Sequence, residues 1–132
     1  MSEENVESVR AGIEAFNSED WDAILEHAAP DFVLDMSRAI GPQQRGMYRL
    51  DQLRSFFEDF TETYESFRIE ADEFIDAGEH VVVPQTAHAR GRDGIEATAR
   101  TAFVYTLRDG AIARMVMYQG RQEAIDAAGL EE

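Results

Sequence analysis

Apolar side chains in the first half of the chain recur mostly at the spacing of amphipathic helices. The pattern predicts a helix over residues 3–17, a short helix that begins after Asp20, and a third helix over residues 50–64. Between the second and third helices, residues 32–38 alternate between apolar and polar in the manner of a strand. A polar loop follows over residues 41–46. This half therefore predicts three helices and a single strand.

The second half of the chain changes to the two-residue period of strands. Residues 67–75 alternate, and three longer runs follow, split by Gly- and Asp-containing turn signals; these runs are residues 81–90, 95–107 and 111–119. A last short helix is predicted over residues 121–128, with Gly129 after its end. Helices gathered before an antiparallel meander predict an α+β fold, in which helices cover one face of a curved sheet and enclose a pocket.

Composition narrows the class of protein and of chemistry. The chain of 132 residues is 44% hydrophobic and shows no repeat or linker, which predicts a single domain over residues 1–132. There is no cysteine, so disulfides and thiol nucleophiles are excluded. All 12 basic residues are arginine, which excludes a Schiff-base or P-loop lysine. The histidines, His27, His80 and His88, lack metal-ligand spacing, so we expect no metal and no cofactor.

Charge argues against two classes of partner. A net charge of −15 repels phosphate groups, so we expect binding neither to nucleic acid nor to an anionic membrane. No apolar run approaches the roughly 20 residues of a membrane-spanning helix. The acidic start of the chain does not look like a signal peptide, so we expect a cytoplasmic protein.

Four stretches of the chain carry a resemblance to a known family; they are residues 16–24, 30–36, 105–112 and 121–130. In their order and spacing they resemble the nuclear transport factor 2-like superfamily, and within it the SnoaL-like polyketide cyclase and ketosteroid isomerase branch. The resemblance implies a cone-shaped, cystatin-like roll: a curved antiparallel sheet with N-terminal helices packed on its concave face. It also implies a homodimer through the convex face, where Val116 and Tyr118 of the last strand supply apolar side chains. The alternative is that these two side chains only pack under the terminal helix.

The chain departs from the isomerase pattern at each catalytic position. That branch uses an aspartate base and an oxyanion hole made by a tyrosine and a protonated aspartic acid. The matching positions here are Gly12, Met36 and Phe103, none of which can transfer a proton. Steroid isomerisation by the familiar route is therefore not expected. A shift of one residue in the first strand would exchange its faces and turn Asp35 inward instead of Met36.

If Met36 faces the pocket, alternation predicts which other side chains face it. The predicted inward positions include His88 with Thr86 and Arg90 on one strand, and further residues on the first strand and on the last two. The result is an apolar pocket with a few polar groups. The predicted ligand-binding residues are Met36, Arg38, Phe103, Tyr105, Met117 and Gln119.

Two residues are candidates for acid–base catalysis, and each has a simpler alternative. His88 has a side-chain pKa suited to proton transfer near neutrality, but it could equally be a hydrogen-bonded histidine with no chemical role. Asp35 is a candidate base or an outward, solvated carboxylate. Arg38 could hold a carboxylate or enolate ligand, or pair with Asp35 or Asp51.

Two functions therefore remain open from the sequence. The first is binding of a small, mostly apolar organic molecule, coupled to proton-transfer chemistry such as cyclisation, isomerisation or dehydration. The alternative is a non-catalytic ligand-binding or protein-association module of the same fold. A strongly perturbed pKa of His88 or Asp35 deep in the pocket would favour an enzyme, and a pocket with no titratable group would favour a binding protein.

Overall fold

The computed structural model describes residues 2–38 and 46–129 of the chain. Within them, the helices are α1 (Ser2–Asn17), α2 (Trp21–Glu26), α3 (Leu50–Thr63) and α4 (Arg121–Ala127). The strands are β1 (Ala28–Asp35), β2 (Met47–Arg49), β3 (Tyr64–Ala71), β4 (Ile75–Ala77), β5 (His80–Gly91), β6 (Glu96–Arg108) and β7 (Ala111–Tyr118). Each predicted helix and strand occurs, with shifted ends. The predicted loop over residues 41–46 lies almost entirely outside the described residues.

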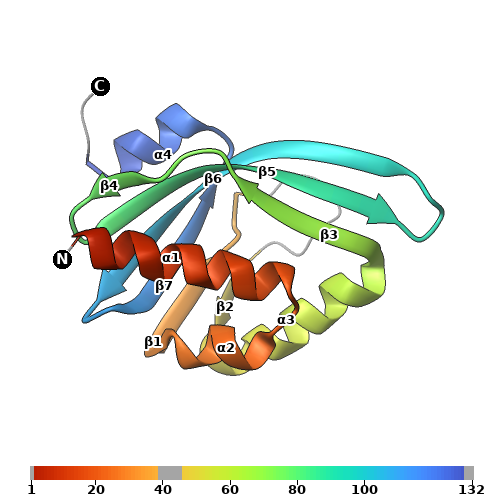
Figure 1. Ribbon diagram of the computed structural model, residues 1–132, viewed down its shortest axis with the longest axis horizontal. Helices are drawn as coiled ribbons and strands as arrows, with labels where there is room; N and C mark the ends of the chain where they lie inside the picture. The colour runs from red at the N-terminus through yellow and green to blue at the C-terminus, as the bar shows by residue number, and fades with distance from the viewer. Residues whose placement is uncertain (1, 39–45, 130–132) are drawn as a thin grey trace.

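The strands form one seven-stranded sheet in the order β2-β1-β7-β6-β5-β3, with β4 paired to β5. Neighbouring strands are antiparallel, except that β1 runs parallel to β7. Figure 1 shows the curved sheet with α1, α2 and α3 on one side and α4 on the other. The predicted α+β class with a curved sheet is confirmed.

The sheet buries apolar side chains on both faces. The concave cluster, on the side of α1 and α3, consists of Val9, Phe32, Leu34, Met36, Leu53, Phe56, Phe57, Val81, Val83, Tyr105, Leu107, Ile112 and Met117. The convex cluster, under α4, consists of Val82, Ala102, Val104, Ala124 and Ile125. Strand β5 belongs to both, because Val81 and Val83 point to one face and Val82 to the other, all at 0% exposure. Burial on both faces explains its nearly continuous apolar run.

Aromatic rings pack α1, α2 and α3 together at one end of the molecule. The Trp21 and Phe57 rings stack with their centroids 4.8 Å apart, and Phe16 meets the edge of Phe57 at 5.7 Å. The side chain of Asn17 fixes the end of α1 to β3, because its Oδ1 accepts from the Ile69 amide at 2.8 Å and its Nδ2 donates to the Ile69 carbonyl at 2.9 Å. These contacts close the helices over the sheet.

Strand β1 starts and ends earlier than the predicted strand over residues 32–38. Pro30 lies inside it, where the register between β1 and β7 shifts between Ala28 and Val33. Proline has no N–H donor, and it is tolerated there because the irregular part of the ladder does not require one. The strand ends at Asp35, so strand alternation does not extend to Arg38.

Strands β5 and β6 extend beyond the end of β7 and form an arm, which we define as residues 86–100. The pairing of β6 with β7 ends at Ala102 and Tyr118, whereas its pairing with β5 continues to Glu96. Figure 1 shows the arm projecting on the right. Next to its turn, Arg92 donates to the Thr61 and Glu62 carbonyls at 2.6 and 2.7 Å, which ties the arm to the end of α3.

Candidate functional site

Four of the predicted ligand-binding residues lie on the concave side of the sheet. Met36, Tyr105 and Met117 belong to the concave cluster, and Phe103 packs against it. Phe103 and Met117 are direct cross-strand partners on β6 and β7. Alternation therefore identifies the inward side chains of β6 and β7 correctly, and Met36 rather than Asp35 faces inward.

Tyr105 places a hydroxyl group among these apolar side chains. The residue is 5% exposed, and burial alone raises the pKa of its phenol far above the usual value. The hydroxyl therefore stays protonated and can donate or accept a hydrogen bond, but it cannot act as a base near neutral pH.

Gln85 is a buried polar residue of this face that the sequence did not predict. It lies on β5 between cross-strand partners Ala71 and Thr101, two positions from Val83, and is 4% exposed. Among the residues that the structure describes, none donates to its side-chain Oε1. Alternation from Val83 would have revealed it only once Val83 was known to pair with Phe103.

Gln119 lies at the rim, past the end of β7, and is exposed. Its Nε2 donates to the Arg38 carbonyl and lies 3.7 Å from the Met117 sulfur. Gln119 directly follows Tyr118, the last paired residue of β7, and lines one groove together with Gln85 and Thr101. Gln85, Thr101 and Gln119 thus form a row of neutral polar residues across three strands, which we call the polar row.

His88 lies on the opposite face, so the prediction that it shares a cavity with Phe103 is wrong. Its cross-strand partner on β6 is Thr98, whereas the partner of Phe103 on β5 is Val83, an odd-numbered position. Thr86 and Arg90 fall on the same outward face as His88. The His88 Nε2 lies 2.9 Å from the Glu70 carboxylate, and the two side chains are 38% and 53% exposed. This is a surface pair, with no contact to the concave cluster.

Asp35 is buried, but on the convex side of β1. Its Oδ1 accepts hydrogen bonds from the Ser37 amide at 3.0 Å and the Ser37 hydroxyl at 2.6 Å, and its Oδ2 lies 3.6 Å from both Arg38 and Arg114. Burial raises the pKa of Asp35, but the Ser37 hydrogen bonds and the two guanidinium groups outweigh it and leave the pKa lowered. The carboxylate therefore stays ionised within an ion cluster and faces away from the predicted pocket.

Arg38 belongs to the same ion cluster. Besides its contact with Asp35, its guanidinium lies 4.7 Å from the centre of the Tyr118 ring. The prediction that Arg38 shares the inward face of Met36 is wrong, because β1 ends at Asp35 and the chain turns. The alternative, pairing with Asp35, is the observed arrangement.

The concave cluster thus offers apolar walls and neutral polar groups. Among its described members, Tyr105 is the sole titratable residue. Across residues 2–38 and 46–129, no three His, Asp or Glu side chains come together in a way that could hold a metal ion. Such a surface can bind and orient a neutral molecule, but it supplies no carboxylate or imidazole for proton transfer.

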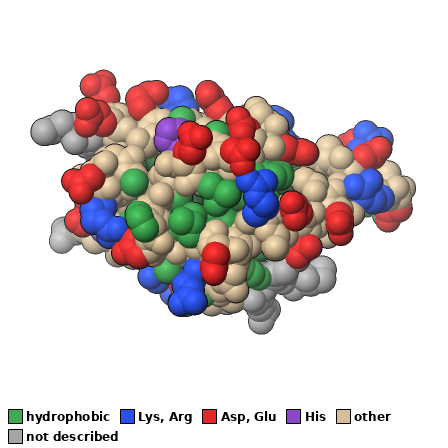
Figure 2. Space-filling view, turned by 90° about the horizontal axis from the view of Figure 1, so that it is seen from below, with side chains coloured by type: hydrophobic (Ala, Val, Ile, Leu, Met, Phe, Trp, Pro, Cys, Tyr) green, Lys and Arg blue, Asp and Glu red, His purple; other side chains and the backbone are tan. Residues whose placement is uncertain are grey.

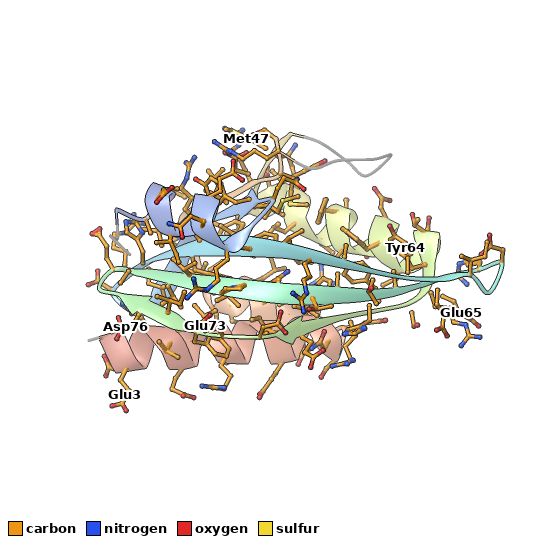
Figure 3. The ribbon with its side chains drawn as sticks, turned by 90° about the horizontal axis from the view of Figure 1, so that it is seen from above. Glu3, Met47, Tyr64, Glu65, Glu73 and Asp76 are labelled. Carbon is orange, nitrogen blue, oxygen red and sulfur yellow. The ribbon has the colours of Figure 1, made fainter. Side chains whose placement is uncertain are left out.

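Two surface hollows lie near this region. A recess of about 20 Å³, about enough for one water molecule, is lined by Phe16, Glu19, Trp21, Phe60, Thr61, Tyr64, Glu65, Ser66 and Phe67. Figure 3 shows Tyr64 and Glu65 at the end of the molecule from which the arm projects. A groove of about 500 Å³ beside the start of α4 is lined by Asp72, Glu73, Pro84, Gln85, Arg100, Thr101, Gln119, Gly120 and Arg121.

Figure 2 shows hydrophobic side chains gathered in the middle of the lower face, ringed by charged ones.

Comparison with known proteins gives the family and the fold. Residues 9–115 match the model of the SnoaL-like domain. An NTF2-like protein of unknown function from Burkholderia pseudomallei is similar in structure, with a TM-score of 0.80 and 26% identity over 96% of this chain and 97% of that chain. No curated protein matches the sequence.

Two further solved structures contain small molecules. TerC, co-crystallised with polyporic acid, has a TM-score of 0.79 and 23% identity over 96% of this chain and 98% of its own. A Mycobacterium tuberculosis protein in complex with estradiol-17β-hemisuccinate has a TM-score of 0.74 and 16% identity over 87% of this chain and 92% of its own. At these identities, the likeness is one of fold.

None of the helices in the described part of this chain is long and apolar enough to span a membrane.

Proposed function

Because the chain belongs to the SnoaL-like domain family, within the NTF2-like superfamily, we propose that its concave cluster binds a small, mostly apolar organic molecule. The observation that carries the proposal is the meeting of Met36, Phe103 and Met117 beside the buried Tyr105 hydroxyl. Apolar walls with a few polar groups are typical of small-molecule sites. The complexes of TerC and of the mycobacterial protein support the same use of the fold.

Room for the ligand comes from methionine side chains. Met36 and Met117 are 8% and 6% exposed and fill the space beside Phe103. Methionine is unbranched and flexible, so it can turn aside for a ligand more readily than a branched side chain can. The bound molecule thus displaces methionine side chains from the concave cluster.

Binding without side-chain proton transfer is the form of this function that the geometry favours. Asp35 and His88, the two candidate catalytic residues, lie on the other face of the sheet. Tyr105 remains protonated because burial raises its pKa. The alternative left open by the sequence, a ligand-binding module without acid–base catalysis, is therefore our preferred reading.

Replacing Phe103 by leucine tests the location of the site. We expect Phe103→Leu to weaken binding of the neutral probe 2-methoxynaphthalene about fivefold, because the aromatic contact is lost while apolar volume is retained. Isothermal titration calorimetry measures the change. His88→Ala is the matched control and should leave the dissociation constant unchanged, since His88 lies on the opposite face. Absence of binding to the unaltered protein would refute the proposed function, and an equal loss in both variants would refute the location.

We also propose that two copies associate through the part of the convex face that α4 leaves uncovered. Tyr118 is half-buried beside α4 and leaves part of its ring for such a contact, whereas Val116 is already buried within one chain, at 7% exposure. Sedimentation equilibrium at micromolar concentration should give about twice the chain mass of 14.9 kDa. A single-chain mass at that concentration contradicts the dimer.

A further inference from the structure

Gln85 is the most unusual polar residue inside the protein. Strand alternation places it on the same face as Val81 and Val83, which are completely buried in the concave cluster. Its side chain is 4% exposed, and no described residue donates a hydrogen bond to Oε1. Buried acceptors are nearly always satisfied, because leaving one without a donor is unfavourable. An acceptor without a partner on this face therefore indicates a hydrogen-bond donor from outside the chain.

We propose that the Gln85 carboxamide accepts a hydrogen bond from a neutral hydroxyl or N–H group of the bound molecule. This inference rests on the proposed function, because it concerns the same concave site. The donor gains a partner that is already desolvated and held in place by two neighbouring strands. Binding then replaces an unsatisfied acceptor by a satisfied one.

The surroundings of Gln85 define the rest of the ligand. In cross-strand order, Val83 and Phe103 form the next pair beyond Gln85 and Thr101, and Met117 follows beside Phe103 on β7. The apolar body of the ligand therefore lies over Phe103 and Met117, and its polar end lies at the polar row. The three side chains of the row are neutral, and the groove that they line also contains two acidic and two basic residues, Asp72, Glu73, Arg100 and Arg121, whose charges balance. The row therefore favours a neutral alcohol, phenol or amide over a carboxylate in that position.

A matched pair of probes isolates this hydrogen bond. 2-Naphthol carries a hydroxyl donor, and 2-methoxynaphthalene has the same ring system with the donor blocked by a methyl group. We expect the unaltered protein to bind 2-naphthol about five to ten times more tightly than the ether. In Gln85→Met, which keeps the size of the side chain but removes the amide, the two dissociation constants should become equal through loss of 2-naphthol affinity alone.

The outcomes separate this inference from the proposed function. If neither probe binds, the proposed function fails and the inference fails with it. If both bind equally to the unaltered protein, or if the ether binds more tightly, the site stands and the role of Gln85 is refuted. Thr101→Val tests whether the neighbouring hydroxyl of the polar row makes this hydrogen bond instead of Gln85. Loss of the preference in Thr101→Val with its retention in Gln85→Met would also refute the role.

Thermal unfolding guards against a purely structural role. Removing a buried carbonyl oxygen that has no donor should leave the melting temperature of Gln85→Met unchanged or higher. A marked fall would mean that Gln85 stabilises the fold through its own hydrogen bonds, for example to internal water, and would overturn the inference. If Gln85→Met does not fold, the same two dissociation constants are measured with Gln85→Leu. The preference of the unaltered protein for 2-naphthol over the ether then still tests the role of Gln85.

Discussion

Replacing Met117 by aspartate is expected to lower the free energy of unfolding by about 3 kcal/mol or more. Met117 is 6% exposed and lies opposite Phe103 in the concave cluster. A carboxylate there would be surrounded by the apolar side chains of the concave cluster. Urea denaturation followed by circular dichroism measures the loss, and failure to accumulate as folded protein is the extreme form of the same result.

The control for this substitution is Ile95→Asp. Ile95 is 68% exposed at the turn of the arm, so the same new charge should remain hydrated there and change stability little. Equal effects of the two substitutions would mean that the concave cluster is not a packed interior. A Met117→Asp protein as stable as the parent would show that the last strand has the opposite face inward.

Replacing Asp35 by asparagine is expected to lower the free energy of unfolding by about 2 kcal/mol at neutral pH. The substitution removes a buried negative charge that Arg38 and Arg114 approach from two sides. It leaves those two cations half-exposed and without their shared partner. Urea denaturation of the parent and the variant at pH 7 gives the difference directly.

The dependence of this difference on pH follows from the lowered pKa of Asp35. Burial raises that pKa, but the Ser37 hydrogen bonds and the two arginines together lower it by more. The pKa in the folded protein therefore lies below the unfolded value of roughly 3.9. The contribution is therefore fully present above that pH and is lost as the pH falls through the folded pKa. The gap between parent and Asp35→Asn should be constant from pH 7 to about 5 and shrink below about 4.

A surface ion pair supplies the comparison for Asp35. Asp31 contacts Arg108 at 2.5 Å, but both side chains are mostly exposed, so Asp31→Asn should change stability little. A gap for Asp35→Asn that widens as the pH falls would contradict the ion cluster described here.

Sequence patterns predicted the fold well because apolar side chains repeat at the helical spacing in the helix layer and at every second residue in the sheet. The helices over residues 3–17 and 50–64 and the three-strand meander were found from apolar spacing alone. The short strands β2 and β4 were missed, since three residues cannot display a period. The start of β1 was also missed, because Pro30 lies within it, where the register with β7 shifts.

Patterns were weaker at the site, and β5 shows why. Val81, Val82 and Val83 are all completely buried, because helices cover both faces of this strand. An uninterrupted apolar run carries no alternation, so nothing in it distinguished the face of Gln85 from the face of His88. The pairing of Val83 with Phe103 settles the assignment, and such pairing is not visible in one sequence. On β7, by contrast, Met117 was assigned correctly.

The arm also affects how the protein behaves at high concentration. In the part of the chain that the structure describes, residues 96–101 of β6 pair on one side with β5 and have no strand on the other. Such an edge is a template for adding strands from other molecules, and thus for fibrous aggregation. Glu96 and Arg100 place charges along it, and the net charge of −15 adds repulsion between whole molecules. Charge, rather than a covering helix or strand, therefore protects this edge from pairing with other molecules. Acidification toward the isoelectric point of about 4.4 removes that protection.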